Sequence, residues 1–494
     1  MTMEFLGRLW SSCCCDGVQA WMILIRVGII SGILFLVWNK VREHRGKRSG
    51  LPLGTLGWPF IGETLEFISC GYSTRPESFM DKRRLLYGKV FKSHLLGSPT
   101  IISTDPEVSK VVLQNDGRIF IPSYPKSLNE LMGKSSILQL NGTMQKKLHG
   151  LIGSFLKSPR LKEQITVDIE KYVLESMSDW QDGQMIYIQD ETKKIAFQVL
   201  LRALMSLNPG DELDYLKQEF KKFISGLISI PVKFPGTRLY KSLQAKANMV
   251  KMVHRIIEDR KANYDTKKRH EDVLDVLLHE TKGAASQFSI DLISDNMIDL
   301  MIPGEDSVPM LMTLAVRYLS GCPLALQQIR EENMMLKKSK EENKELVTWS
   351  DYMSLSFTQN VITETLRLGN IITGVLRKAL EDVEIKGYLI PKGWSVLTYF
   401  RSIHLDEEFY ESPYKFDPWR WQEKDPSGSS FTAFGGGHRL CPGVEIARLE
   451  VSMFLHLLVT QYIWEAEEDS IVSFPTVYMK KRMPIKIRKI TSHY

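Results

Sequence analysis

The stretch FGGGHRLCPG, residues 434–443, sets one cysteine among four glycines and one arginine. Glycine has no Cβ, so this backbone can approach another group closely and adopt positive φ values. The apolar run that begins at Val444 predicts a helix whose N-terminus would stabilise negative charge on the Cys441 sulfur. The other cysteines are Cys13, Cys14, Cys15, Cys70 and Cys322. They form no CxxC pair and no zinc-ligand spacing, so Cys441 has no partner cysteine in the sequence.

The residues of the loop leave three interpretations of Cys441 open. A thiolate that binds haem iron needs backbone N–H groups that donate to the sulfur and tune the iron, and Arg439 suits a haem propionate. A nucleophilic or redox-active cysteine needs a nearby base, for which His438 is available. A buried cysteine on a glycine turn would have a structural role alone.

The wider pattern decides among these interpretations. F-x-x-G-x-R-x-C-x-G, carried by Phe434, Gly437, Arg439, Cys441 and Gly443, resembles the cysteine-ligand loop of the cytochrome P-450 superfamily of haem-thiolate monooxygenases. The resemblance covers residues 50–490 and implies a mainly helical fold with a small β region. It also implies haem b (iron protoporphyrin IX) with Cys441 as the iron ligand, and electrons that come from NADPH through a reductase. Arg439, Arg448 and His438 are then plausible contacts for that reductase.

Two further motifs occur in the order that the family shows. ETLR gives E-x-x-R at Glu364 and Arg367, a pair that faces one side of a helix. FDPWRW follows and supplies Arg420, which can complete the pair. The resemblance implies that these three residues form a structural ion-pair cluster behind the haem.

The segment MIDLMIPGEDSVPML, residues 297–311, resembles the long central helix of the family with its [AG]-G-x-[DE]-T signature. Gly304, Asp306 and Ser307 align with the glycine, the acid and the hydroxyl, and serine replaces the usual threonine. Splitting bound dioxygen requires protons, and an acid beside a hydroxyl provides a relay for them. The alternative is that Asp306 and Ser307 are solvent-facing helix residues.

Pro303 and Pro309 bracket that segment. Each lacks an N–H, so the carbonyls of Asp299 and Glu305 lose their helical partners. We expect a kinked helix whose free carbonyls are available to water or to a hydroxyl of the substrate.

The propionate contacts depart from the family pattern. Where the family usually has W-x-x-x-R, the sequence NGTMQKKLHG has Gln145 and His149. Both side chains can donate hydrogen bonds, although histidine is charged only near or below neutral pH. Arg377, together with Arg439, is the stronger candidate.

The nearest resemblance within the family is to plant steroid hydroxylases that oxidise the brassinosteroid side chain at C-22 or C-23. The stretches that carry it are MIPGEDSVP, the segment after E-x-x-R, YKFDPWRWQ and FPTVYMKKRMPIKI. It implies a sterol or steroid substrate and an apolar pocket, although the same residues can be ordinary core. The expected lining residues are Ile121, Tyr124, Leu128, Met132, Met297, Met301, Ile371, Ile372, Val375 and Val477.

Two other functions stay open on the sequence. One is a haem-thiolate isomerase or lyase that rearranges a lipid without dioxygen or a reductase. The other is a non-catalytic haem or sterol binder. Retention of the Asp306–Ser307 pair favours the monooxygenase, and dependence on NADPH would separate the monooxygenase from the isomerase or lyase.

The N-terminal region predicts a membrane anchor. The run from Trp21 to Trp38 has one charged residue, Arg26, and tryptophans at both ends. Basic residues follow it, so we expect a single-pass anchor in the endoplasmic-reticulum membrane. The predicted division is a lumenal N-terminus (1–20), the anchor (21–38), a basic and Pro/Gly-rich linker (39–64) and a cytosolic catalytic domain (65–494).

Charge and composition agree with this division. Of the net charge of +6, residues 39–50 contribute +4 through five basic side chains and one acidic side chain. The excess of basic residues is therefore largely confined to this segment and does not indicate that the protein binds nucleic acid. Hydrophobic residues make up 43% of the sequence, which excludes global disorder. Residues 75–375 read as mainly helical, with strands expected at 88–104, 376–400 and 463–490.

Overall fold

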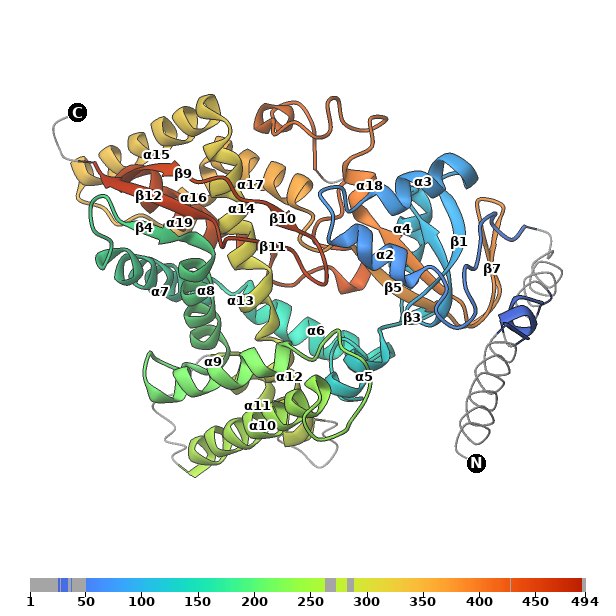
Figure 1. The fold of residues 1–494 in the computed structure, drawn as a ribbon. Coiled ribbons are helices and arrows are strands. Elements are labelled where there is room, and N and C mark those ends of the chain that lie inside the picture. Colours follow the sequence, from blue (N-terminus) through green and yellow to red (C-terminus); the bar gives the residue numbers. More distant parts are fainter. Residues whose placement is uncertain are drawn as a thin grey trace, which may run out of the picture.

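The computed structural model describes residues 25–26, 28–33, 37, 50–262, 272–281, 288–426 and 428–490. A helical body occupies most of the molecule, and a five-stranded sheet lies at one end of it (Figure 1). The fold is mainly helical with a small β region, as the sequence predicts.

The described helices of eight residues or more are α2 (Thr64–Gly71), α3 (Ser78–Tyr87), α4 (Pro106–Gln114), α6 (Gly142–Leu156), α7 (Pro159–Ser178), α8 (Ile188–Met205), α9 (Asp211–Ile224), α10 (Arg238–Ala262), α12 (Ile290–Asp299), α14 (Val308–Ser320), α15 (Pro323–Asn343), α17 (Ser356–Gly369) and α19 (Val444–Gln461). The shorter ones are α5 (Lys126–Met132), α11 (Val273–His279), α13 (Ile302–Asp306), α16 (Trp349–Ser354), α18 (Phe400–His404), η1 (Pro418–Trp421) and η2 (Gly437–Arg439). The strands are β1 (Val90–Leu95), β2 (Ser98–Ser103), β3 (Phe120–Pro122), β4 (Met185–Tyr187), β5 (Gly374–Ala379), β6 (Val383–Ile385), β7 (Tyr388–Ile390), β8 (Ser395–Tyr399), β9 (Tyr462–Ala466), β10 (Ile471–Val472), β11 (Tyr478–Met479) and β12 (Pro484–Lys489).

The largest sheet joins segments that are far apart in the sequence. Its order is β1-β2-β8-β5-β3, and only the β2–β8 pair is parallel, with Ile101 opposite Val396. Alternating and β-branched residues favour these strands, and the three regions expected to be strands are confirmed. In Figure 1 the blue strands of the N-terminal part lie beside the orange strands of the C-terminal part.

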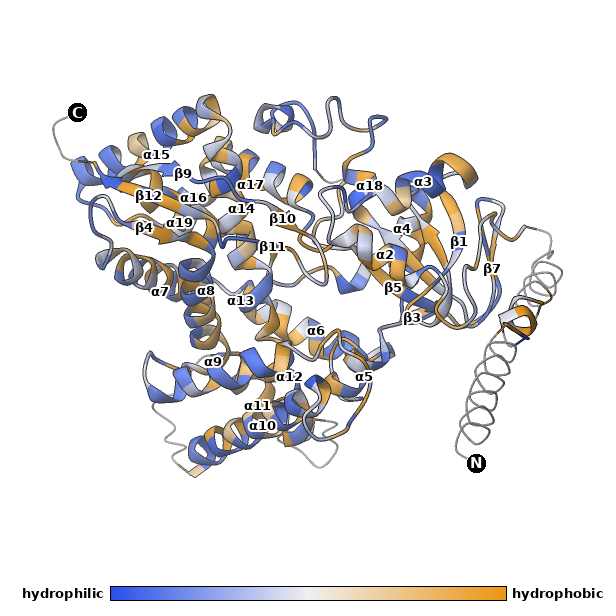
Figure 2. Ribbon diagram, in the orientation of Figure 1, coloured by the Kyte–Doolittle hydropathy of each residue, from blue (hydrophilic) through white to orange (hydrophobic). Residues whose placement is uncertain are grey.

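Two apolar cores fill the helical body. The larger one lies around α14, α17 and α19, whose residues are buried on nearly all sides, as expected for helices at the centre of a large domain. The second packs α8, α9, α10 and α12 together. Figure 2 shows hydrophilic residues along α10 and α15, which cover the outside of the body.

A buried ion-pair cluster fixes α17 to the segment before the cysteine loop. The carboxylate of Glu364 accepts hydrogen bonds from Arg367 (2.7 and 2.9 Å) and from Arg420 Nε (3.1 Å). The amide of Asp417 (3.0 Å) and the indole N–H of Trp421 (2.9 Å) also donate to it. Five donors thus compensate one carboxylate whose side chain is 0% exposed.

The Arg367 guanidinium is satisfied on its other side. It donates to the carbonyls of His404 and Pro413, both at 2.7 Å. A buried charge is tolerated when its hydrogen bonds are complete, and here they are supplied from three segments of the protein.

Residues 51–63, expected to be part of a linker, are attached to the sheet. The amide of Lys92 donates to the carbonyl of Leu53 (2.8 Å), and Arg83 pairs with Glu63 (2.8 Å). Residues 1–24 and 38–49, which include most of the predicted lumenal, anchor and basic segments, lie outside the described residues. Ile25, Arg26 and residues 28–33 are helical.

Within the described ranges, no individual helix combines the length and the hydropathy needed to cross a bilayer. Ile290–Ser320 and Pro323–Asn343 meet both requirements only as a pair, and they are bent by 116° relative to each other.

Replacement of Glu364 tests how much the ion-pair cluster contributes to the free energy of unfolding. Glu364→Ala would leave the buried Arg367 charge without its carboxylate, and we expect a loss of about 3–5 kcal/mol in the free energy of unfolding. Glu331→Ala, at an exposed glutamate of α15, should change that free energy by no more than about 0.5 kcal/mol. Chemical denaturation of both variants measures the difference. Equal free energies of unfolding would contradict the contribution assigned to the cluster.

Candidate active site

The cysteine loop is closed by its own backbone. The amide of Cys441 donates to the carbonyl of Phe434 (3.1 Å), and Gly435 and Gly437 have φ values of 79° and 65°. A Cβ on Gly437 would collide with the Leu113 carbonyl at the end of α4. The loop therefore needs glycine at 437 both for its left-handed backbone and for its close contact with α4.

A buried histidine makes a hydrogen bond to the backbone just before the cysteine loop. His404 Nε2 accepts a hydrogen bond from the amide of Thr432 (3.0 Å), and its Nδ1 donates to the Asn370 Oδ1 (2.7 Å). Burial lowers the pKa of His404 to about 3, so the ring stays neutral and Nε2 remains an acceptor. His404 was not among the residues expected from the sequence.

The Cys441 sulfur lies at the start of α19. Burial raises the pKa of the Cys441 thiol, and the N–H of Gly443, which donates to the sulfur, opposes that rise. The unpaired N–H groups at the N-terminus of α19 favour a negative charge at the same place. These donors suit a thiolate that binds a metal.

Three basic side chains converge on one buried carboxylate beside the loop. Asp116, 1% exposed at its side chain, lies 2.6 Å from Arg377 Nε and 3.4 Å from His438 Nε2. Arg439 Nε donates to the same carboxylate, and another N–H of Arg439 donates to the Ile137 carbonyl (3.1 Å). Burial lowers the pKa of His438, while Asp116 opposes that shift.

This arrangement can hold a group with two carboxylates. Two arginines face a single carboxylate, so the site keeps an excess of positive charge. Arg377 Nε is close enough to Asp116 for an ion pair, but its N–H does not point at the oxygen and makes no hydrogen bond to a described residue. That orphaned buried donor, next to Arg439, fits the propionates of haem.

Sequence reasoning missed Asp116. It lies just beyond α4 and is 323 positions from Arg439, so no local pattern links the two. An acid that follows a helix is an ordinary surface feature in sequence, and only the packing of α4 on η2 brings it to the loop.

The two residues that replace the family's propionate contacts lie on α6. His149 Nε2 donates to the carbonyl of Leu440 (2.9 Å), next to Cys441, so this ring holds the loop backbone. Gln145 is buried, and among the described residues its Oε1 has no hydrogen-bond partner. The expectation for Gln145 stays a prediction, whereas His149 has a partner in the protein.

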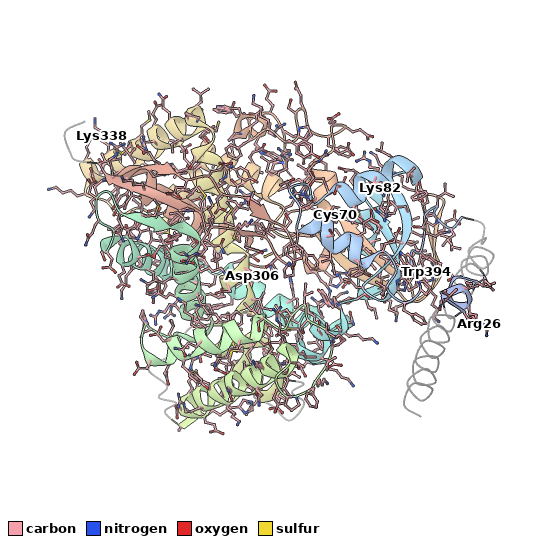
Figure 3. All side chains as sticks on the ribbon, in the orientation of Figure 1. Arg26, Cys70, Lys82, Asp306, Lys338 and Trp394 are labelled. Carbon is pink, nitrogen blue, oxygen red and sulfur yellow. The ribbon has the colours of Figure 1, made fainter. Side chains whose placement is uncertain are left out.

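The acid and the hydroxyl of the central segment are adjacent at a helix break. Asp306 ends α13, and Ser307 separates α13 from α14. Burial raises the pKa of Asp306, with Glu305 acting in the same direction and Lys193 against it. In Figure 3, Asp306 lies near the middle of the molecule, where α13 joins the upper and lower helices.

Gly304 has a packing role in this structure. A Cβ at this position would lie 2.7 Å from Leu200 Cδ2 and 3.3 Å from the Ala196 carbonyl, both on α8. Glu305 next to it pairs with Lys193 of α8 (2.7 Å). The glycine therefore allows α13 to approach α8, and its direct part in catalysis stays a prediction.

The two prolines interrupt the central helix as expected. α12 ends at Asp299, α13 contains Pro303 near its start, and α14 contains Pro309 near its start. The side chain of Pro303 is exposed, although its neighbours in sequence are largely buried.

The expected pocket residues fall into two groups. Met132, Met297, Met301 and Val477 lie in the apolar cores with at most 2% exposure, and their part in a substrate pocket stays a prediction. Sequence could not separate these, because core and pocket walls use the same apolar residues. The half-buried or exposed members are Ile121, Tyr124, Leu128, Ile371, Ile372 and Val375.

Arg448, which the sequence suggests as a contact for the reductase, makes hydrogen bonds within the protein. Its guanidinium donates to Gln359 Oε1 (3.2 Å) and Thr363 Oγ1 (3.1 Å) of α17. Burial lowers the pKa of Arg448 to about 10. The charged group thus faces α17, and a direct contact of Arg448 with the reductase stays a prediction.

Comparison with known proteins agrees with this site. The family model described as cytochrome P450 matches residues 52–487. A 3-epi-6-deoxocathasterone 23-monooxygenase of Arabidopsis thaliana is 59% identical over 89% of this chain and 90% of its own length. A second Arabidopsis thaliana protein with the same activity in its name is 56% identical over 90% and 86%. A 3beta,22alpha-dihydroxysteroid 3-dehydrogenase of the same organism is 41% identical over 94% and 98%.

Comparison with a solved structure supports the assignment of the fold and nothing beyond it. The retinoic acid bound cyanobacterial CYP120A1 matches with a TM-score of 0.78 and 24% identity, over 90% of this chain and all of that one. The family uses haem iron and electrons from a reductase. By its sequence match, its relatives and its fold, this chain belongs to the cytochrome P450 family.

Proposed function

We propose that this chain is a membrane-anchored monooxygenase that hydroxylates the side chain of a steroid of the brassinosteroid class at C-23. The observation that carries the proposal is 59% identity to a named 23-monooxygenase over about nine-tenths of both proteins. Identity to the relative named for oxidation at C-3 is lower, at 41%. This difference favours the side chain over the ring system as the site of oxidation.

Haem, when bound, would supply the iron at which dioxygen is activated. Cys441 would bind that iron through its sulfur, with the N–H of Gly443 and the start of α19 stabilising the negative charge. Arg377 and Arg439 would bind the propionates, and Asp116 would hold both arginines in place. Gln145 is an additional donor for a propionate.

Asp306 and Ser307 would move protons on the opposite side of the haem. A carboxyl whose pKa is raised by burial exchanges a proton more readily near neutral pH, and the Ser307 hydroxyl can both accept and donate. Lys193 pairs with Glu305 and favours the ionised form of Asp306, so the salt bridge to α8 would help to set its proton affinity.

Exposed apolar side chains support attachment to the endoplasmic-reticulum membrane. They occur before and on α2 and in the segment between α9 and α10. The members with at least half of their surface exposed are Leu53, Trp58, Phe60, Ile61, Leu65, Tyr72, Ile230 and Phe234. Together with the predicted anchor at 21–38, they would give a lipophilic substrate access from the bilayer.

An NADPH-dependent reductase would bind near the cysteine loop. His438 and Arg439 are turned toward Asp116, so exposed lysines nearby are better contacts for an acidic partner. Lys146, exposed on α6, is close enough to lower the pKa of His438. The isomerase or lyase alternative has no support in the two relatives named as monooxygenases.

Turnover assays test the function. The purified protein with reductase, NADPH and a panel of steroids should add one oxygen at C-23, identified by product mass and NMR. Product formed without NADPH would indicate an isomerase or lyase. A hydroxyl placed on the ring system would contradict the proposed position.

Cys441→Ala tests the iron ligand. We expect loss of the thiolate-type absorption band of the reduced carbon monoxide complex, because alanine offers no donor to the iron. Cys322→Ala, at another free cysteine, should keep the band. A thiolate band that survives in Cys441→Ala would refute the ligand assignment.

Asp306→Asn tests the relay. We expect turnover to fall by about 10²-fold and NADPH to be consumed without matching product, with haem content unchanged. Asp291→Asn, at a side chain that is 84% exposed, is the control and should retain full coupling. The ratio of product to NADPH is the measurement, and a wild-type ratio in Asp306→Asn would exclude the role.

A further inference from the structure

Asp299 is a buried carboxylate that the fold does not satisfy. It ends α12, and its residue is 5% exposed. None of the described residues makes a hydrogen bond of good geometry to either of its oxygens. An unpartnered polar group in the interior costs about 1–3 kcal/mol, so a carboxylate left in this state calls for a partner from outside the protein.

Lys246 and Asn296 have hydrogen-bond partners other than Asp299. Lys246 of α10 pairs with Asp295 (2.8 Å) and donates to the Met132 carbonyl (2.6 Å). Asn296 exchanges hydrogen bonds with residues 135 and 137. Burial raises the pKa of Asp299 to about 7, with the Asp295 charge acting in the same direction, and Ser136 and Lys246 oppose the rise without forming a hydrogen bond of good geometry to it.

Asp299 lies on the same broken helical segment as Asp306 and Ser307. The segment 290–320 carries all three residues, and Pro303, which lies between Asp299 and Asp306, is exposed. Asp299 and Ser307 are eight positions apart, which would be about 12 Å along the axis of an unbroken helix. The Asp299 carbonyl on the same turn also lacks a helical donor, because residue 303 is proline.

The groups around Asp299 favour a ligand that donates a hydrogen bond from a hydroxyl. Lys246, the cation that acts on Asp299, is paired with Asp295 and is not available to hold a substrate carboxylate. The surroundings are otherwise apolar, with Leu131, Met132 and Met301 fully buried nearby in the same core. A rigid lipophilic molecule with a hydroxyl at one end matches such a wall.

We propose that Asp299 is a specificity-determining residue that accepts a hydrogen bond from a hydroxyl on the steroid ring system, at the end remote from the oxidised side chain. The inference rests on the proposed function. A site that must pair a buried acceptor discriminates strongly against an analogue that lacks the hydroxyl, because the acceptor then stays unpaired.

Spectral titration of the haem-loaded protein tests the proposal. The probes are a 3,22-dihydroxysteroid, its 3-deoxy analogue and its 22-deoxy analogue, and the signal is the change in the haem absorption band on binding. We expect the wild-type protein to bind the diol about 10- to 100-fold more tightly than the 3-deoxy analogue. In Asp299→Leu this ratio should fall to about threefold or less, with affinity for the 3-deoxy analogue retained.

A matched set of variants separates specificity from structure. Asp291→Asn, an exposed carboxylate of the same helix, should keep the wild-type ratio. Asp299→Leu should raise the midpoint of unfolding of the substrate-free protein, because it removes an unpaired buried carboxylate; a merely structural carboxylate would lower it. If the leucine variant does not take up haem, Asp299→Asn keeps the shape and should still reduce the ratio several-fold.

The outcomes distinguish the two proposals. Wild-type protein that binds none of the three steroids overturns the proposed function. Binding of the diol with an unchanged ratio in Asp299→Leu overturns the role of Asp299 and leaves the function intact. A ratio that changes for the 22-deoxy analogue alone overturns the assignment to the remote hydroxyl.

Discussion

The carboxylate of Glu364 is the interaction on which the cysteine side of the molecule depends. It gathers Arg367, Arg420 and Trp421, and Arg367 in turn holds the carbonyl of His404. The His404 ring then binds the amide of Thr432, two residues before the loop begins. A continuous polar path therefore runs from a helix interior to the backbone that presents Cys441. Buried charges of this kind contribute little net stability, but they define a single arrangement of the segments that they join.

On the other side of the site, breaks in one long helix determine where the polar residues lie. Prolines break one long helix into α12, α13 and α14, and the polar residues of functional interest lie at those breaks: Asp299, Asp306 and Ser307. A regular helix would satisfy its own carbonyls and direct these groups along one continuous surface. The breaks leave backbone acceptors free and set side chains at the ends of short helices. Close packing of Gly304 on α8 holds the broken helix in place.

Local patterns predicted the elements and the motif residues because each carries its signal in a few consecutive positions. The cysteine loop, the E-x-x-R helix and the strands at 88–104 and 376–400 are of this kind. Asp116 and His404 could not be found in this way, since their partners lie far along the sequence and their own neighbourhoods look ordinary. The pocket residues are the part that sequence constrains least: Met297 and Met301 are apolar in sequence whether they face a ligand or the core, and both are fully buried in the structure.

The strand order β1-β2-β8-β5-β3 has a consequence for biosynthesis. β1 and β2 can pair with each other early, but the second edge of β2 and the strand β3 find their partners only after residues 374–399 have been synthesised. At about 5–20 residues per second, the ribosome would leave the open edge of β2 waiting for many seconds. Nascent forms of this protein would therefore depend on chaperones that cover an unpaired strand edge, and fragments that stop before residue 374 would be prone to aggregation.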